Sequence, residues 1–320
     1  MTDIDSRTCR WMACLVLAVG LTATATAPGL AGELEPPVPP GTPTMKPLNE
    51  LEPRRPIMAA MLPLTITEAG SSWYFAEDIT TDGAGITVQT ERVTIDLMGF
   101  SLVGGSGVGI NAGTSSGLTV RNGTLQGWAA TCLLSGNSAR VEDLRVLSCG
   151  GSGISTGYDS LVLDTVSSWN SVHGIIVKAG SVVRGCRADY NDENGVWAEE
   201  QASFVGALVT GCMVGWNTKN GIRVDGHSTV IDNQVHHNGN PDKAGIWIVG
   251  NRNRIEGNTV LNNNTGIDLD GSNNMIARNL VGASLVSNFD IDYMALLNMI
   301  TISQIWSTTP HDPWANIEIP

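Results

Sequence analysis

Proline is nearly absent from the middle of this chain. Of its 14 prolines, only Pro241 lies between Pro63 and Pro310. The interior of a β-sheet excludes proline, because proline has no N–H to donate to the ladder. The gap therefore permits a continuous β region over residues 64–300, whereas the ten prolines from Pro28 to Pro63 predict an extended linker.

Other absences exclude whole classes of protein. Lys and Arg number 18 against 31 Asp and Glu, and the net charge of −13 disfavours binding to nucleic acid or to an anionic membrane surface. No segment combines helix periodicity with helix-forming residues, which argues against helical repeats. The L-x-x-L-x-L frame of leucine-rich repeats is missing, and so is the six-residue repeat of left-handed β-helices. The C-x-x-C spacing of a structural metal site is also missing.

A repeat occupies the region that proline leaves free. Between Gly221 and Val281 a Gly-Ile pair occurs three times, and each pair is followed about nine residues later by an aliphatic residue that lies three positions before an asparagine. Upstream, in steps of 21, 25 or 26 residues, the aliphatic position continues as a column. Its members are Ile276, Ile255, Val230, Val209, Val183, Val162, Val141, Val120 and Ile95.

Two further columns keep the same period. Five residues after the first column lie Phe100, Leu125, Val146, Ser167, Ala188, Val214, Val235, Val260 and Val281. Eight residues after it lie Cys149, Asn170, Asn191, Asn217, Asn238 and Asn263. A period in the twenties indicates a solenoid whose repeats bury their apolar sides against one another.

Each repeat holds three short β-branched runs separated by Gly, Asn, Ser and Asp, which is typical of three strands and three turns. Parallel strands cross over right-handedly by default. We therefore predict an all-β fold, a right-handed, single-stranded parallel β-helix of about nine to ten coils. Stacked at one turn about 4.8 Å apart, the asparagines would bond to each other and to the turn backbone, which makes them structural.

The sequence divides into five segments. Residues 1–31 read as a signal peptide, with arginines before an apolar run and small residues at the cleavage site; a single membrane anchor is the alternative, but the run is short for a span. Residues 32–63 form the Pro-rich linker, 64–84 an N-terminal cap, 85–300 the β-helix and 301–320 a C-terminal cap or tail. We therefore expect a bacterial protein that is secreted, periplasmic or on the cell surface, without a stable membrane span after cleavage.

Four cysteines remain after cleavage. Cys132 falls in the Gly-Ile column and Cys149 in the asparagine column, whereas Cys186 and Cys212 stack one coil apart. Neighbouring coils lie slightly too far apart for a favoured disulfide geometry. Buried thiols are therefore the favoured interpretation, although export leaves a disulfide open.

A packed interior leaves the outer surface for function, and alternation along the Gly-Ile strand identifies the outward residues. Trp197 and Trp247 face outward two coils apart, about 10 Å, with Arg223 between them. That spacing would suit two stacked sugar rings. Two insertions, Glu199–Gly206 and Gly239–Ala244, would wall a trough on either side of this floor.

Further polar residues surround the two tryptophans. Outward positions and the adjacent turn supply Lys178, Glu199, Asp225, Asp268, Asp270 and His227. These groups could bond hydroxyls or carboxylates of a sugar. Any acidic solenoid also needs exposed carboxylates for solvation, so each of them has a purely structural alternative.

The Gly-Ile and asparagine repeats resemble those of the right-handed parallel β-helix proteins of the pectate lyase-like superfamily. The flanks MKPLNELEPRRPI and DPWANIEI are similar to those of exported bacterial members without established activity. Active members of the superfamily cleave or epimerise acidic polysaccharides. They use an Arg or Lys base with Ca²⁺ held by carboxylates, or paired aspartates.

The resemblance leaves two classes of function open. A polysaccharide lyase or epimerase would use Lys178 or Arg223 as the base, with Ca²⁺ held by the carboxylates of Asp225, Asp268 and Asp270. A glycoside hydrolase would instead pair Glu199 with Asp225 or Asp268.

In either case Trp197, Trp247, Asp270 and His227 would contact the substrate. The alternative is a non-catalytic cell-surface or envelope solenoid that binds glycan or protein along its side. No cofactor other than Ca²⁺ is implied.

Overall fold

The computed structural model describes residues 54–199, 205–239, 241–291, 299–300, 302–304 and 315–319. The predicted signal peptide, most of the Pro-rich linker and much of the C-terminal tail lie outside the described residues. In the described part, no helix is both long enough and apolar enough to span a bilayer.

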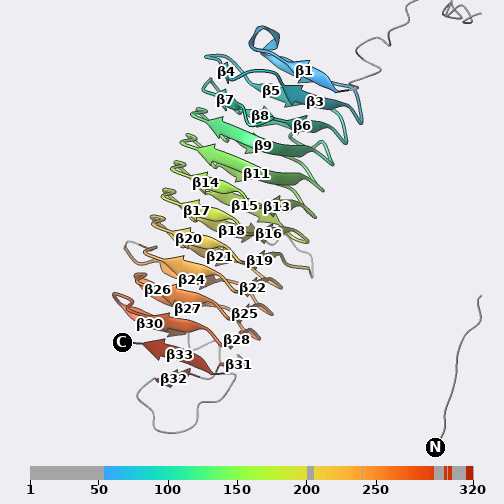
Figure 1. Ribbon diagram of the computed structural model, residues 1–320. Helices are drawn as coiled ribbons and strands as arrows, with labels where there is room; N and C mark the ends of the chain where they lie inside the picture. Colours follow the sequence, from blue (N-terminus) through green and yellow to red (C-terminus); the bar gives the residue numbers. More distant parts are fainter. Residues whose placement is uncertain are drawn as a thin grey trace, which may run out of the picture. The chain divides into compact units, whose positions relative to one another are not determined.

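Residues from 54 onward wind into a right-handed parallel β-helix with almost no helical structure (Figure 1). Each complete coil contributes up to three short strands, and each strand pairs in parallel with the equivalent strand of the next coil. The first two strand series join into one 22-stranded sheet, and the third forms a separate 11-stranded sheet. The predicted fold class is confirmed.

The first series contains β1 (Arg55–Ile57), β3 (Ser72–Phe75), β6 (Thr94–Asp96), β13 (Leu161–Leu163), β16 (Val182–Arg184), β19 (Leu208–Thr210), β22 (Thr229–Ile231), β25 (Arg254–Glu256), β28 (Met275–Ala277) and β31 (Met299–Ile300). The second contains β4 (Ile79–Thr80), β7 (Ser101–Val103), β14 (Val166–Ser168), β17 (Arg187–Asp189), β20 (Met213–Gly215), β23 (Gln234–His236), β26 (Thr259–Leu261), β29 (Leu280–Gly282), β33 (Asn316–Ile319) and, beside β33, β32 (Ile302–Gln304). The long strands β9 (Thr119–Gln126) and β11 (Arg140–Leu147) belong to both series.

The third series contains β2 (Leu64–Ile66), β5 (Ile86–Val88), β8 (Ile110–Asn111), β10 (Leu133–Leu134), β12 (Ile154–Ser155), β15 (Ile175–Lys178), β18 (Val196–Glu199), β21 (Ile222–Val224), β24 (Ala244–Ile248), β27 (Thr265–Leu269) and β30 (Ser287–Ile291). One 3₁₀ turn, η1 (Ala59–Met61), lies near the start. These eleven strands correspond to about eleven coils, slightly more than predicted. The excess arises at the N-terminal end, where strands β1 to β4 carry neither the Gly-Ile nor the asparagine signal.

The residues of each predicted column pair with one another between neighbouring strands of the sheets. Along the first column, the Cα partners run from Ile95 and Val120 through to Ile255 and Ile276. The second column holds from Leu125 onward. Its first member is wrong, because Leu125 pairs with Leu102 and not with Phe100. The turn before β7 is two residues longer than its equivalents, which moves the inward position from residue 100 to residue 102.

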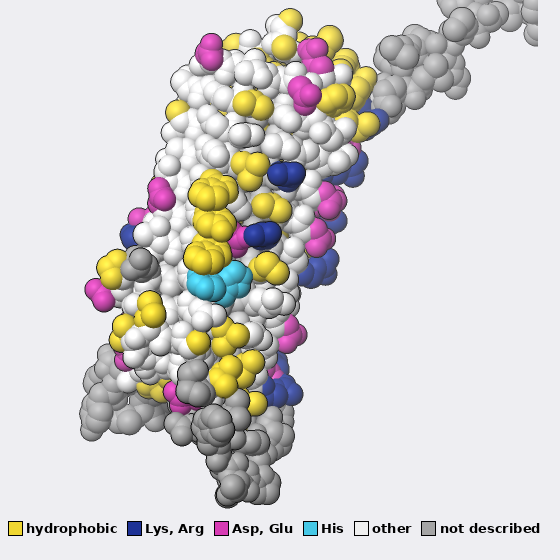
Figure 2. Space-filling view, turned by 60° about the vertical axis from the view of Figure 1, so that its left-hand side comes forward, with side chains coloured by type: hydrophobic (Ala, Val, Ile, Leu, Met, Phe, Trp, Pro, Cys, Tyr) yellow, Lys and Arg dark blue, Asp and Glu magenta, His cyan; other side chains and the backbone are white. Residues whose placement is uncertain are grey.

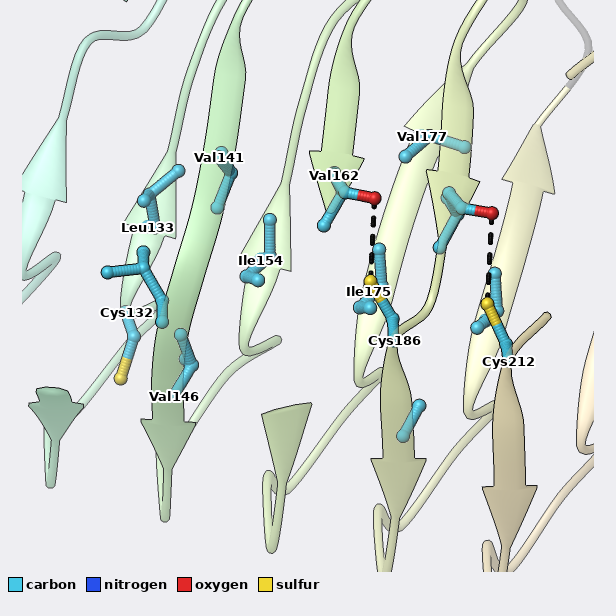
Figure 3. Packing of buried hydrophobic residues seen from close by; sticks show 14 of the residues in the cluster. Cys132, Leu133, Val141, Val146, Ile154, Val162, Ile175, Val177, Cys186 and Cys212 are labelled. Carbon is cyan, nitrogen blue, oxygen red and sulfur yellow. Dashed lines mark hydrogen bonds between the residues drawn. The ribbon is translucent and has the colours of Figure 1, made fainter. Parts of the chain in front are cut away.

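The columns build the core. Inward side chains along β21, Ile222 and Val224, are fully buried, whereas Arg223 between them faces outward. Figure 3 shows part of the resulting stack, in which aliphatic residues of successive coils lie one above the other. Each such side chain contributes about 1.5–3 kcal/mol when it leaves water, so the repeats stabilise one another.

Asparagine ladders close the turns. The side-chain oxygen of Asn217 accepts from both the backbone N–H and the side-chain amide of Asn191, at 3.0 and 2.9 Å, and Asn238 does the same for Asn217. A second ladder runs through Asn258 and Asn279. The predicted structural role of the asparagines is confirmed.

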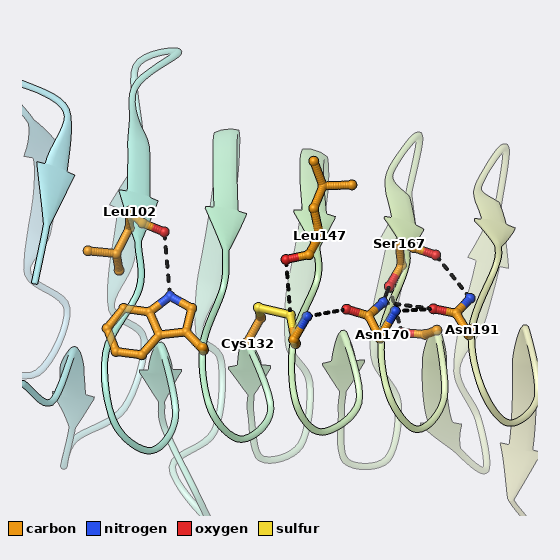
Figure 4. The surroundings of a disulfide bond; sticks show 9 residues. Leu102, Cys132, Leu147, Ser167, Asn170 and Asn191 are labelled. Atoms are coloured by element: carbon orange, nitrogen blue, oxygen red, sulfur yellow. Dashed lines mark hydrogen bonds between the residues drawn. A yellow bond between two sulfur atoms is a disulfide. The ribbon is translucent and has the colours of Figure 1, made fainter. Parts of the chain in front are cut away.

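The preference for four buried thiols is wrong for one pair, because Cys132 and Cys149 form a disulfide with Cα atoms 5.8 Å apart (Figure 4). In the next coils along the chain, the same two positions hold a glycine and a ladder asparagine that face each other. A Cβ at Gly174 would lie 2.7 Å from the amide nitrogen of Asn191. The cysteines therefore pair across a turn, where the approach is close, and not along the stack.

The stacked cysteines behave as expected. Cys186 and Cys212 are free and buried, and each thiol lies against a backbone carbonyl of the preceding coil, Val162 or Val183 (Figure 3).

Outside the core, one side of the solenoid carries a row of hydrophobic and histidine side chains over its middle coils (Figure 2).

Candidate functional site

The outer face of the 11-stranded sheet brings the main candidates into one row. Trp197 on β18 pairs with Arg223 on β21, which pairs with Trp247 on β24, which pairs with Asp268 on β27. All four side chains are partly exposed, between inward neighbours that are buried. Strict alternation along each strand therefore positions them.

Arg223 is held between the two indoles. Its guanidinium carbon lies 4.6 Å from the ring centroid of Trp197 and 4.8 Å from that of Trp247. This arrangement fits a planar cation on two electron-rich faces. The two indole faces that were expected to stack on sugar rings are thus covered by Arg223, and a ligand would meet the indole edges and the guanidinium N–H groups.

Trp197, Arg223 and Trp247 form a stack, which we call the sandwich. Carboxylates fix both of its ends. Asp225 accepts from Nε of Arg223 at 3.2 Å and from the indole N–H of Trp197 at 3.3 Å. Asp270 accepts from the indole N–H of Trp247 at 2.8 Å. The two tryptophans and the arginine are therefore held before any ligand arrives.

A hollow of about 370 Å³ opens beside the sandwich. It is lined by His173, Glu193, Asn194, Trp197, Lys219, Asn220, Arg223, Lys243 and Trp247. Lys219 pairs with Glu193 at 2.6 Å, and Lys243 lies 5.8 Å from the ring of Trp247. Three cations and one carboxylate therefore line the hollow; Lys219 and Arg223 are paired with Glu193 and Asp225, and Lys243 lies beside Trp247.

His173 enters the hollow as a neutral donor. Burial lowers the pKa of His173 to about 4. Its Nδ1 accepts the backbone N–H of Asn194 at 3.1 Å, so the neutral ring carries its proton on Nε2. The ring also meets Trp197 edge to face, with centroids 5.1 Å apart.

Asp268 lies at the other end of the row, next to Trp247 and in register with Asp290 of β30. Partial burial, and then the carboxylates of Asp270 and Asp290, raise the pKa of Asp268 to about 6. A carboxyl that keeps its proton near pH 6 can donate it, which is what a general acid requires.

The three aspartates predicted to hold Ca²⁺ are spread along the row. Asp225 and Asp270 each accept an indole N–H from a different tryptophan, two coils apart. Across the residues that the structure describes, no group of three or more His, Cys, Asp or Glu side chains could hold a metal ion. The described residues therefore add no support to Ca²⁺ at Asp225, Asp268 and Asp270, and this site stays a prediction.

Three other candidates lie outside the hollow's lining. Lys178 pairs in register with Glu199 at the end of β15 and β18, and its ammonium lies 5.5 Å from the ring of Tyr158. His227 lies on the turn after β21, where Nε2 is 3.4 Å from the guanidinium of Arg252. Neither contact is directed at the sandwich.

The expected trough walls are only partly within the described residues. Lys243, from the second insertion, lines the hollow. In the first insertion, residues 200–204 lie outside the described residues. The role of this loop as a wall stays a prediction.

The sequence reasoning missed His173, Glu193, Lys219 and Lys243. A usable signal was present: three of them lie two residues before the glycine of the Gly-Ile strand, and His173 lies one residue before it. Those positions end the turn that enters the strand, so they share one side of the row.

The family model described as "right handed beta helix region" matches residues 69–206 and 201–282. No curated protein matches the sequence. Among solved structures, the A-module of the Azotobacter vinelandii mannuronan C-5 epimerase AlgE4 is similar, with a TM-score of 0.52 and 14% identity over 74% of this chain and 77% of that chain.

A variant of the periplasmic alginate epimerase AlgG gives a TM-score of 0.51 and 13% identity over 83% of this chain and 77% of that chain. Identities this low establish a shared fold and not a shared activity. The family model covers more than half of the chain, and the residues that it matches lie within the coils described above. The chain therefore belongs to the family of proteins with a right-handed β-helix region.

Proposed function

We propose that this is an exported protein that binds an acidic polysaccharide along the outer face of β18, β21 and β24. The observation that carries the proposal is the guanidinium of Arg223, fixed between Trp197 and Trp247 at the edge of a hollow that Lys219 and Lys243 also line. Preformed concave sites with a few convergent polar groups are the usual binding sites of carbohydrates and other small ligands.

The side chains have separate roles in this proposal. Arg223, Lys219 and Lys243 offer N–H groups to the carboxylates of a uronate chain, and the planar guanidinium suits a carboxylate best. Nε2 of His173 donates to a hydroxyl. The edges of Trp197 and Trp247 contact the apolar parts of the sugar rings.

Two further observations support an acidic polymer. Three cations line the hollow although the chain carries a net charge of −13, so their grouping is not a consequence of composition. Two structures that share the fold are named as epimerases of mannuronan and alginate. Export is part of the proposal and rests on the signal-like segment at residues 1–31.

Catalysis on the bound polysaccharide is a second candidate function, and one observation favours it. Asp268, with its pKa raised to about 6, lies two residues from Asp270 on the same outer face, and Asp270 is fixed by Trp247. A pair of carboxyls, one of which has a raised pKa, is the arrangement that glycoside hydrolysis uses. A product assay separates the outcomes. New reducing ends without unsaturated ends indicate hydrolysis, unsaturated ends indicate a lyase, and a changed uronate composition without cleavage indicates an epimerase. None of these products indicates binding alone.

The binding proposal is tested by calorimetry with hexamers of mannuronate and of galacturonate. We expect at least one of them to bind, and the double variant Trp197→Ala, Trp247→Ala to lose that binding. Arg184→Lys, on the outer face of β16 in the other sheet, is the control and should bind as the unchanged protein does. Equal affinity of the double variant, with its fold intact, would place the site elsewhere.

A further inference from the structure

A second aromatic feature lies outside the hollow described above. Trp169, Tyr190, Trp216 and His237 occupy the same turn position in four successive coils, each directly before a ladder asparagine. Adjacent rings are parallel within 10°, with centroids 4.2, 6.0 and 4.1 Å apart. We call this row the aromatic ladder; it forms the row of hydrophobic and histidine side chains in Figure 2.

The turn does not require these rings. All four residues have φ between 54° and 62°, and so do Ser148 and Asn262 at the equivalent position of the flanking coils. This left-handed conformation favours asparagine and disfavours bulky side chains. Ring stacking accounts for how the rings are tolerated there, but it does not account for their exposure, which is 60% for Trp169 and 47% for Trp216.

The ladder ends in a hollow of about 410 Å³. After His237 the next coil carries Asn262, whose short side chain leaves room beyond the last ring. The hollow is lined by Trp216 and His237 together with Thr218, Asn262, Asn264 and the 81% exposed Leu285. None of the residues that line it is Asp, Glu, Lys or Arg. Rings, amides, a hydroxyl and an absence of charge suit an uncharged, hydroxyl-rich ligand.

The size of the ladder argues against a second copy of the chain as the occupant. An aromatic side chain buries about 150–250 Å² when fully covered. The exposed fractions of Trp169, Tyr190 and Trp216, 60, 37 and 47%, therefore leave on the order of 300 Å². A stable protein interface needs about 800 Å² per partner.

We propose that the aromatic ladder and the hollow at its end form a second carbohydrate site, which takes neutral sugars. A pyranose ring would lie in the hollow beyond His237, with its hydroxyls on Thr218, Asn262 and Asn264 and its apolar carbons against the imidazole and Leu285. The exposed edges of the ladder would contact neighbouring sugars of the same chain. This site does not depend on the acidic-polysaccharide site, since the two linings share no residue.

The test uses calorimetry with neutral hexasaccharides of glucose, mannose, galactose and N-acetylglucosamine. We expect at least one to bind, with an affinity unchanged between 0.1 and about 0.5 M NaCl, because no charged group is involved. Trp216→Asn should weaken binding at least tenfold while keeping the turn, since Asn262 adopts the same conformation two coils away.

Asn262→Trp tests the hollow directly. The new indole would continue the ladder and fill the hollow, so binding should be lost although the fold is kept, as judged by circular dichroism and the melting temperature. Met98→Asn is the matched control, an exposed hydrophobic residue with φ of 54° that lies away from the ladder. It should leave binding unchanged.

Three results would overturn the proposal. The first is that no neutral hexasaccharide binds. The second is binding that survives both Trp216→Asn and Asn262→Trp. The third is a concentration-dependent dimer in analytical ultracentrifugation that Trp216→Asn abolishes. This result would assign the ladder to self-association. The mannuronate and galacturonate hexamers report separately on Arg223, so the two proposals fail independently.

Discussion

Arg223 stacks on Trp197 of the preceding coil, with its guanidinium carbon 4.6 Å from the indole centroid. Asp225 ties the pair together by accepting a hydrogen bond from each. The three groups are held by strand register and by one carboxylate, so their geometry does not depend on a ligand. Such preorganisation lowers the entropic cost of binding.

The shape of Arg223, and not only its charge, is expected to matter. Arg223→Lys keeps the charge but loses the planar group that stacks on both indoles and grips a carboxylate. We expect the affinity for a uronate hexamer to fall at least tenfold, and the free energy of unfolding to fall by about 1–2 kcal/mol. Calorimetry and chemical denaturation measure the two effects. An unchanged affinity would show that any cation suffices.

His173 is expected to make the fold sensitive to acid. Its pKa is lowered from 6.5 to about 4 in the folded state. The unfolded chain therefore takes up the proton first, and the stability that His173 contributes above pH 6.5 is lost as the pH falls towards 4. We expect a loss on the order of 2 kcal/mol over this range.

Asparagine at position 173 provides the matched variant. Asn194 and Asn220 hold the equivalent position in the next two coils and accept the same kind of backbone hydrogen bond. His173→Asn should therefore keep the fold and flatten the pH dependence between 6.5 and 4, measured by denaturation at several pH values. A dependence that persists unchanged would mean that another group titrates.

Asp268 is expected to change the stability with pH in the opposite direction to His173. Its folded pKa is raised from 3.8 to about 6, so folding favours the protonated form. The stability associated with this group is fully present below pH 3.8 and is lost as the pH rises through 6. Asp268→Asn should therefore stabilise the protein above pH 6, by on the order of 1–2 kcal/mol for this partly exposed group. Equal stability of the two proteins at pH 7.5 would contradict this assignment.

The Cys132–Cys149 disulfide replaces a glycine–asparagine pair. Cys132→Ser with Cys149→Ser should lower the free energy of unfolding by about 2–4 kcal/mol, because the unfolded chain gains entropy. Cys132→Gly with Cys149→Asn should recover part of that loss, since Gly174 and Asn191 fill the same positions two coils later in the chain. Chemical denaturation measures the stability of the two double variants. Equal stability would contradict the expectation that a glycine–asparagine pair can replace the disulfide.

The sequence predicts most of the fold because the repeat encodes the register. Val230, Ile255 and Ile276 pair as the period requires, and Asn217 and Asn238 bond to each other as stacked amides. An inward side chain every second residue and one coil every 21 to 26 residues leave little freedom. The prediction fails at Phe100, where the period is broken by a longer turn.

The candidate site is less predictable, because it depends on contacts between coils that the repeat does not encode. The outward row of Trp197, Arg223 and Trp247 follows from alternation, but the insertion of the guanidinium between the indoles does not. The disulfide was missed for a similar reason: pairing was considered along the stack, whereas Cys132 and Cys149 meet across a turn.

The most direct test of the account is a crystal structure of residues 32–320 with a bound uronate hexamer. We predict that the hexamer lies along β18, β21 and β24, with one carboxylate within hydrogen-bond distance of Arg223 and a second near Lys219 or Lys243. A hexamer bound on any other face of the solenoid, with the hollow beside Trp197 and Trp247 empty, would contradict the account.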